Sequence, residues 1–403
     1  MNGSTSGGSS SARTNRLWRA LGLRGFVLVI VVIVATIGDA QTKPIKPAGA
    51  EPKPEPAVSA ILGAFDRYEV VGMPEAHGGK DLDDFILSLI RDPSFPGKVN
   101  DIEVECGNSM YQAVLDRYIA GEDVPFVEVQ KVWRDTTQAM CGTSGFFEQF
   151  FPLVRAINQK LPIEKRLRVL AGDPPIEWDH VKSVDDYHKF LNRDVTVASV
   201  MDQEVLSKHR KALMLFGTFH LFHGAPDAVS IYEKKYPNVT FIITDVGYFS
   251  ASLALSSENP FVGWQVPSLA KIKNTWIANV GLDSFFPPPV FIDKNCNATS
   301  EFPKPLQKPM GEMVDAILYL GAGNLALREQ MPADIALDTD YMAELQRREN
   351  FAGYFGPTTR TLEEFNRQIV KGASKALVEI PKPPDLKRDT KNCLEHKNRS
   401  AVH

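Results

Sequence analysis

The segment MPEAHGG contains the residues in this sequence whose types and spacing most clearly allow chemistry. Glu75 and His77 stand two residues apart, directly before Gly78 and Gly79. A glutamate and a histidine at this spacing can point the same way from an extended loop, where they could transfer protons or bind a metal ion. Histidine suits general-base catalysis because its ordinary pKa lies near neutrality, and a nearby carboxylate stabilises its charged form. The alternative interpretation is a polar turn with an incidental histidine.

Further acids and imidazoles follow other apolar runs. Glu105 ends the run DIEVE, and Glu103 shares its face because side chains alternate along a strand. A charged glutamate is seldom buried without a partner, so we expect one of the two to be functional and the other to be at most a salt-bridge partner. Glu105 is the favoured candidate because it lies closer to the strand end. His220 follows the run ALMLFG and is expected in the same site, with His223 packed behind it.

Arg134 and Asp173 are candidates for supporting roles. Arg134 could bind a carboxylate or phosphate of a substrate through paired hydrogen bonds, or neutralise developing negative charge. Its alternative is a surface ion pair with Asp135 or Glu128. Asp173 could orient a histidine of the site, or it could only form a turn before the prolines that follow it. Together with His223, these two residues make up the predicted substrate-binding set.

Several other catalytic signatures are missing from the sequence. It contains no GxSxG nucleophile elbow, no GxxxxGKS or GxxxxGKT phosphate loop and no HExxH zinc motif. The net charge is −4 over 403 residues, and no strongly basic stretch occupies the predicted folded region, so nucleic acid is not an expected partner. The expected site is therefore built from histidines and carboxylates and acts on a small molecule or a peptide.

Five short apolar runs predict the buried β-strands that position these residues. The runs cover residues 68–73, 101–105, 168–171, 212–217 and 239–244. Apolar residues at helical spacing lie between them, for example over residues 82–90. Strands that alternate with helices indicate a three-layer α/β fold, in which helices cover both faces of a largely parallel sheet and further helices are inserted. Because the carboxyl ends of parallel strands meet at one edge, we expect the acids and imidazoles that follow them to face one crevice.

The N-terminal residues predict export. Four arginines between residues 13 and 24 precede an apolar run over residues 26–37, which has the length of a signal-peptide core and is short for a membrane span. We interpret residues 1–40 as an export signal cleaved after Ala40, with an uncleaved N-terminal membrane anchor as the alternative. Both interpretations place the folded part outside the cytoplasm, in the periplasm or the extracellular space.

The rest of the chain divides by composition. Residues 41–57 are rich in proline and lysine and are expected to form an unpacked linker. Residues 58–380 contain no proline-, glycine- or serine-rich break and are expected to form a single α/β domain, followed by a charged tail over residues 381–403.

The four cysteines form no CxxC motif and no zinc-binding pattern, and disulfides are permitted in an exported protein. Cys106 with Cys141 is a possible pair. Cys296 with Cys393 is the weaker possibility, because both lie in irregular regions.

Three motifs together resemble the erythromycin esterase-like proteins. They are the strand followed by Glu75-Ala-His77-Gly and a helix, the strand that ends in Glu105, and the late strand followed by Gly217-Thr-Phe-His220. The resemblance spans roughly residues 60–325 and extends to the wider group that includes the ChaN-like haem-uptake proteins and the Tiki/TraB proteases. It implies that His77 is a general base on water and that His220 is a further site residue. It also implies that Glu75 and Glu105 orient the base or stabilise charge.

The leading hypothesis is an exported hydrolase that uses water activated by His77, either esterase-like or metal-assisted. A Tiki-like metalloprotease is one alternative, and there a divalent metal ion would be bound by Glu75, His77, Glu105 and His220. A ChaN-like protein that binds haem, iron or another small ligand without catalysis is the other. Membrane contact is expected only through the N-terminal segment, if it is not cleaved.

Overall fold

The computed structural model describes residues 48–403 except for several short segments. The segments left out are 76, 247–259, 262, 285–290, 293–294, 322–325, 328, 353–361, 375–377, 380–385 and 401–403. The predicted export signal and the first part of the predicted linker lie outside the described residues. Within the described part, no helix is long and apolar enough to cross a membrane.

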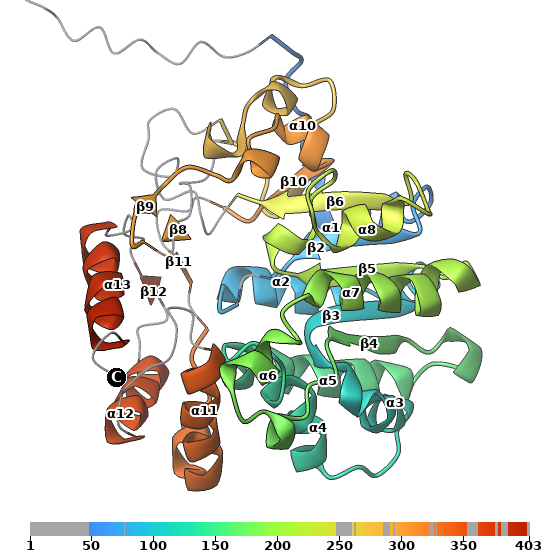
Figure 1. Cartoon of the computed structure of the whole chain (residues 1–403). Coiled ribbons are helices and arrows are strands. Elements are labelled where there is room, and N and C mark those ends of the chain that lie inside the picture. Colours follow the sequence, from blue (N-terminus) through green and yellow to red (C-terminus); the bar gives the residue numbers. More distant parts are fainter. Residues whose placement is uncertain are drawn as a thin grey trace, which may run out of the picture. The chain divides into compact units, whose positions relative to one another are not determined.

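An eight-stranded sheet forms the centre of the described unit (Figure 1). In spatial order its strands are β1 (Glu55–Pro56), β7 (Ser268–Lys271), β10 (Ala316–Tyr319), β6 (Thr240–Asp245), β2 (Val70–Pro74), β5 (Ala212–Phe216), β3 (Asp101–Asn108) and β4 (Arg168–Asp173). The strands from β10 to β4 pair in parallel, whereas β7 pairs antiparallel with β10 and β1 pairs antiparallel with β7. The five predicted strands correspond to β2, β3, β4, β5 and β6.

Helices lie between these strands and after the last of them in the chain. They are α1 (Ala57–Ala64), α2 (Lys80–Arg91), α3 (Gln112–Ala120), α4 (Phe126–Arg134), α5 (Gly145–Asn158), α6 (Val184–His188), α7 (Arg193–Val200), α8 (Ala228–Glu233), α10 (Met310–Met313), α11 (Thr339–Ala352), α12 (Leu362–Ala373) and α13 (Leu386–Ser400). The predicted apolar spacing over residues 82–90 falls within α2.

Strand β5 shows how helices come to cover both faces of the sheet. Leu213 and Leu215 belong to the apolar core that also contains residues of α1 to α5. Met214 and Phe216 point the other way, into the core that contains residues of α7, α8 and α10. A strand that is buried on both faces has a continuous run of apolar residues in its sequence, which is why ALMLFG predicts a strand of this kind. The three-layer α/β fold is therefore confirmed.

The last residues of the predicted linker pair with the sheet edge, which corrects the expectation of a free tether for this part of it. Glu55–Pro56 forms β1 and pairs with Leu269 and Ser268 of β7. Helix α1 begins directly afterwards, at Ala57. A proline is tolerated here because an edge strand leaves one side of its backbone unpaired. The edge of the sheet thus holds a segment whose composition alone predicts a linker.

Both of the possible disulfides are present. Cys106 on β3 is bonded to Cys141, and Cys296 is bonded to Cys393. Cys393 lies within α13, so the predicted charged tail contains a helix that a disulfide ties to the preceding region. Two small two-stranded sheets accompany this region, formed by β8 (Phe291–Ile292) with β9 (Ala298–Thr299) and by β11 (Ala326–Leu327) with β12 (Val378–Glu379).

Candidate active site

The carboxyl ends of β2, β5 and β3 meet at one edge of the sheet. β2 pairs in parallel with β5 up to Pro74 and Phe216. The amide of Glu75 continues this pairing by donating a hydrogen bond to the carbonyl of Phe216 at 2.9 Å. β3 pairs in parallel with the other side of β5. This arrangement places Glu105, near the end of β3, beside the loops that follow β2 and β5.

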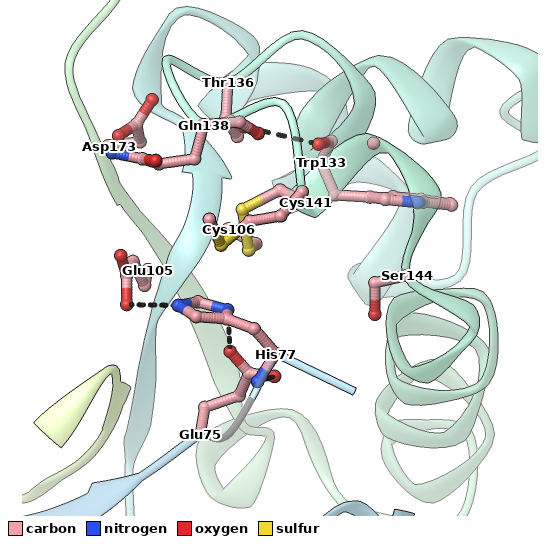
Figure 2. Close-up of a disulfide and its surroundings, with 12 residues drawn as sticks. Glu75, His77, Glu105, Cys106, Trp133, Thr136, Gln138, Cys141, Ser144 and Asp173 are labelled. Carbon is pink, nitrogen blue, oxygen red and sulfur yellow. Dashed lines mark hydrogen bonds and ion pairs between the residues drawn. A yellow bond between two sulfur atoms is a disulfide. The ribbon is translucent and has the colours of Figure 1, made fainter. Parts of the chain in front are cut away.

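His77 lies between two carboxylates, as Figure 2 shows. Its Nδ1 atom is 2.6 Å from Oε2 of Glu75, and its Nε2 atom is 3.5 Å from Oε2 of Glu105. The short contact with Glu75 lacks hydrogen-bond alignment, but the amide of His77 donates to Oε1 of Glu75 at 2.9 Å. His77 has a φ of 43° and Gly78 a φ of 105°, so both adopt the left-handed conformations that make the sharp turn.

His220 lies beside the other carboxylate oxygen of Glu105. It ends the single-turn helix Thr218–His220 that follows β5. Its Nε2 atom is 3.4 Å from Oε1 of Glu105, and its Nδ1 atom is 2.8 Å from Oδ1 of Asp194. Glu75, His77, Glu105, His220 and Asp194 therefore alternate as carboxylate and imidazole, and we call this set the histidine–carboxylate chain.

Arg193 supports the centre of this chain. Its Nη1 atom donates to Oε1 of Glu105 at 2.9 Å, and its Nε atom donates to Oδ1 of Asp173 at 2.8 Å. The backbone amide of Gly217 donates to the other oxygen of Glu105 at 2.5 Å. Glu105 is thus buried with a guanidinium, a backbone amide and two imidazole rings around it, which is the environment that a buried ionised carboxylate requires.

The charges of the site shift the pKa values of its members. Burial would raise the pKa of Glu105, but the charge of Arg193, followed by those of His77 and His220, holds it well below its usual range. Burial would lower the pKa of His77, but Glu75 and Glu105 raise it well above 6.5. Burial acts on His220 in the same way, and Glu105 with Asp194 raises its pKa to about 9. At neutral pH the free protein therefore holds an ionised Glu105 between two largely protonated rings.

Asp173 lies behind Arg193, which corrects its predicted position beside a histidine. Its Oδ2 atom accepts from the amide of Thr137 at 2.6 Å, and its Oδ1 atom accepts from the Thr137 hydroxyl at 2.7 Å. Its exposed fraction is 0%, so it cannot touch a substrate. The structure gives it a different role, which is to fix the guanidinium that holds Glu105.

Arg134 and His223 do not join the site, contrary to their predicted substrate-binding roles. Arg134 pairs with Glu148 at 3.0 Å, so the alternative of an ion pair holds, although with a different partner from those expected. His223 lies between Glu233 and Asp315, with 3.0 Å to each. Each residue is thus already paired with acids outside the histidine–carboxylate chain.

Glu103 is not the salt-bridge partner that the sequence allows. Its exposed fraction is 0%, and neither of its carboxylate oxygens has a hydrogen-bond partner in the described part of the chain. Burial first, and then the charge of Asp101, raises its pKa well above the ordinary value. Glu103 is therefore a neutral buried acid.

Sequence reasoning misses Arg193 and Asp194. Both lie in the first turn of α7, after Asn192, and the surrounding sequence LNRDVT has neither an apolar run nor a catalytic motif. The one signal in the sequence is the helix start itself. Charged residues in the first turn of a connecting helix can reach the edge of the sheet where functional groups gather.

The donor atoms do not fit a metal centre as they stand. Within the described residues, one set of histidine, cysteine and acidic ligand atoms lies within 4.8 Å of one another, and it consists of Glu75, His77 and Cys106. The sulfur of Cys106 is bonded to Cys141 and cannot act as a thiolate. The predicted four-residue set does not gather within that distance, and Arg193 already supplies the cation beside Glu105.

Comparisons with known proteins find similar chains among solved structures. No family model matches this protein, and no curated protein matches it. Among solved structures, a crystal structure of a Bacillus cereus protein is 10% identical with a TM-score of 0.42, and it covers 67% of this chain and 94% of its own. A succinoglycan biosynthesis protein is 11% identical with a TM-score of 0.41 and the same coverage, 67% and 94%. The type III effector HopBA1 is 13% identical with a TM-score of 0.31, covering 50% of this chain and 88% of its own. At these TM-scores the likeness carries no argument about this protein.

Proposed function

We propose that this protein is a hydrolase of ester-type acyl substrates, in which His77 takes a proton from the attacking water. The observation that carries the proposal is the histidine–carboxylate chain, in which both rings turn their Nε2 atoms toward Glu105. In each ring the Nδ1 atom faces an outer carboxylate, Glu75 for His77 and Asp194 for His220. An acid beside Nδ1 orients the ring and stabilises its charged form, as catalytic histidines require.

The exposure of these side chains indicates which of them can transfer protons and which can only stabilise charge. The side chains of His77 and His220 are 25% and 21% exposed, whereas that of Glu105 is 3% exposed. Water and substrate can therefore reach the rings but not the central carboxylate. Proton transfer belongs to the rings, and Glu105 stabilises the charge that appears on them.

The proposed reaction follows from these roles. Neutral His77 takes one proton from a water molecule as the water oxygen bonds to the acyl carbon. Protonated His220, with a pKa of about 9, gives a proton to the departing alcohol oxygen. The products are an acid and an alcohol. Because the neutral ring of His77 is needed and its pKa is raised, the reaction is favoured as the pH rises above neutrality.

The other candidate functions receive less support from the geometry. Haem or iron ligation through an Nε2 atom would place a second cation beside Glu105, which Arg193 already neutralises. A metalloprotease site needs a compact ligand set, which the disulfide-bonded chain does not provide. We also propose that the protein acts after export, and its two disulfides support an oxidising compartment.

The test is ester hydrolysis by wild type and by His77→Asn, assayed above neutral pH with a panel of ester substrates. Asparagine tolerates the left-handed backbone of this position, so the substitution removes the base with little strain. We expect kcat to fall by about 10²–10⁴-fold. His223→Gln is the matched control, because it removes a histidine with two acidic partners outside the site and should retain activity. Equal rates for wild type and His77→Asn, or no ester hydrolysis by wild type, would overturn the proposal.

A further inference from the structure

The disulfide beside the candidate site involves a residue that could otherwise bind a metal ion. Cys106 directly follows Glu105 on β3, and Figure 2 shows its bond to Cys141 next to the ring of His77. The Cys106 sulfur, a ring nitrogen of His77 and a carboxylate oxygen of Glu75 all lie within 4.8 Å of one another. Only the bond to Cys141 prevents this sulfur from acting as a ligand.

The donor set indicates which metal ion would be bound. A thiolate, an imidazole and a carboxylate together are typical of Zn²⁺, and three protein ligands leave a fourth position for water. Cys106 and Glu75 are buried, whereas the His77 side chain is 25% exposed. An ion therefore has an approach from the side of His77. The negative charge of Glu75 already lies 2.6 Å from the ring nitrogen.

We propose that the Cys106–Cys141 disulfide caps a zinc site, so that the reduced chain binds one Zn²⁺ through Glu75, His77 and Cys106 and the oxidised chain does not. A dithiol would supply the two electrons and two protons that convert the disulfide into two thiols, and would itself become a disulfide. Zn²⁺ then displaces the proton of the Cys106 thiol and the proton of the His77 ring. Exchange with a disulfide-containing oxidant, which takes up the two electrons and the two protons and becomes a dithiol, re-forms the Cys106–Cys141 bond and releases the ion.

The consequence for activity rests on the proposed function, but the binding itself does not. A zinc ion on one nitrogen of His77 would leave the ring proton on the other nitrogen, so neither could accept a proton from water and the reduced, zinc-loaded chain would be inactive. Formation of the disulfide would release the ring. The same bond that ties the end of β3 to the Cys141 segment would then also activate the base.

Two single substitutions test the zinc site with a matched control. Cys141→Ser leaves a free thiol at Cys106, whereas Cys106→Ser breaks the same disulfide but leaves the thiol at Cys141. Co²⁺ is the probe, because thiolate ligation gives a charge-transfer band in the near ultraviolet. We expect Cys141→Ser to bind one equivalent with this band, and Cys106→Ser and oxidised wild type to show no such band. Adding His77→Asn to Cys141→Ser should weaken Co²⁺ binding at least about tenfold.

A second measurement uses the wild-type chain in case the variants do not fold. The protein is reduced with a phosphine, freed of it, and reoxidised in air with or without Zn²⁺. Zn²⁺ should slow the return of the Cys106–Cys141 bond relative to the Cys296–Cys393 bond, followed by peptide mapping. Equal slowing of both bonds, or the same Co²⁺ band in both cysteine variants, would refute the zinc site. A Co²⁺ band in a protein without esterase activity would instead refute only the proposed function.

Discussion

Glu103 and Glu105 stand two residues apart on the same face of β3, and their surroundings are opposite. Glu105 accepts hydrogen bonds from Arg193 and from the amide of Gly217. Glu103 pairs in register with Leu170 and Met214, and its carboxylate has no hydrogen-bond partner among the residues that the structure describes. One acid is held ionised and the other neutral. Burial alone therefore does not mark a functional acid, and what decides its state is whether loops at the end of the sheet can bring donors to it.

Asp101 is a third acid on this face of β3. Asp101 begins β3, and Arg210 donates to its two oxygens at 2.6 and 2.8 Å. Regular pairing of β3 with β5 runs from Asp101 to Val104, so Glu105 lies just past this stretch and Glu103 lies within it. Asp101 and Glu105 each have an arginine, and Glu103 does not. Ends of strands adjoin connecting segments, which can supply long cationic side chains, whereas the middle of a strand adjoins only other strands and the helices packed on them.

The largest expected effect is that of Glu105→Gln, which removes the central charge without changing the shape of the side chain. It leaves Arg193 buried with Asp173 as its remaining partner. We expect the free energy of unfolding to fall by about 3 kcal/mol and ester hydrolysis to be lost. Urea denaturation and the ester assay measure the two effects. Unchanged stability would mean that the hydrogen bonds of Glu105 stabilise the fold no more than the surroundings of Glu103 do, which would contradict the difference between the two acids.

The same substitution at the neighbouring acid should act in the opposite direction. We expect Glu103→Gln to raise the free energy of unfolding at pH 8 by about 1–3 kcal/mol, because Glu103 must take up a proton to be buried. The raised pKa fixes the sign: above the ordinary pKa of 4.5 the folded state binds a proton that the unfolded state has lost. Wild-type stability from this group is therefore lost as the pH rises from 4.5 toward the raised pKa. Denaturation curves at pH 4 and pH 8 test this, and a gain that does not shrink at pH 4 would contradict it.

Asp101→Asn should have the smallest effect of the three. Its partner Arg210 is partly exposed, with 30% of its side chain accessible, so water can solvate the guanidinium when the carboxylate is removed. We expect a loss of about 1 kcal/mol in the free energy of unfolding and full ester hydrolysis. A loss as large as that of Glu105→Gln would show that an exposed arginine matters as much as a buried one.

The sequence predicts the fold and the central residues of the site better than it predicts the residues that surround them. Strands buried on both faces leave continuous apolar runs, and Glu75, His77, Glu105 and His220 follow or end such runs. These four residues do converge, because the carboxyl ends of parallel strands share an edge.

The remaining residues depend on contacts between distant segments that leave no local pattern. Arg193 reaches Glu105 from the start of α7, and nothing in its own segment indicates that partner. Arg134 has the right chemistry for substrate binding, but Glu148 from the next helix neutralises it. Asp173 follows the strand-end rule, yet its carboxylate turns toward Thr137 and Arg193 instead of a histidine. Residue type and spacing thus locate candidates, and the pairing of charges across helices selects among them.

Because β2 lies in the middle of the sheet, the histidine–carboxylate chain is completed only late in synthesis. β2 starts at Val70, but its two neighbours start only at Ala212 and Thr240. Pairing between segments so far apart requires closing long loops, which makes it slow and late. A nascent chain that ends before β5 already contains Glu75 and His77 but lacks the strand that positions them. Such a chain lacks the complete histidine–carboxylate chain and exposes a strand that is apolar on both faces, which makes it prone to aggregation until the rest of the sheet is present.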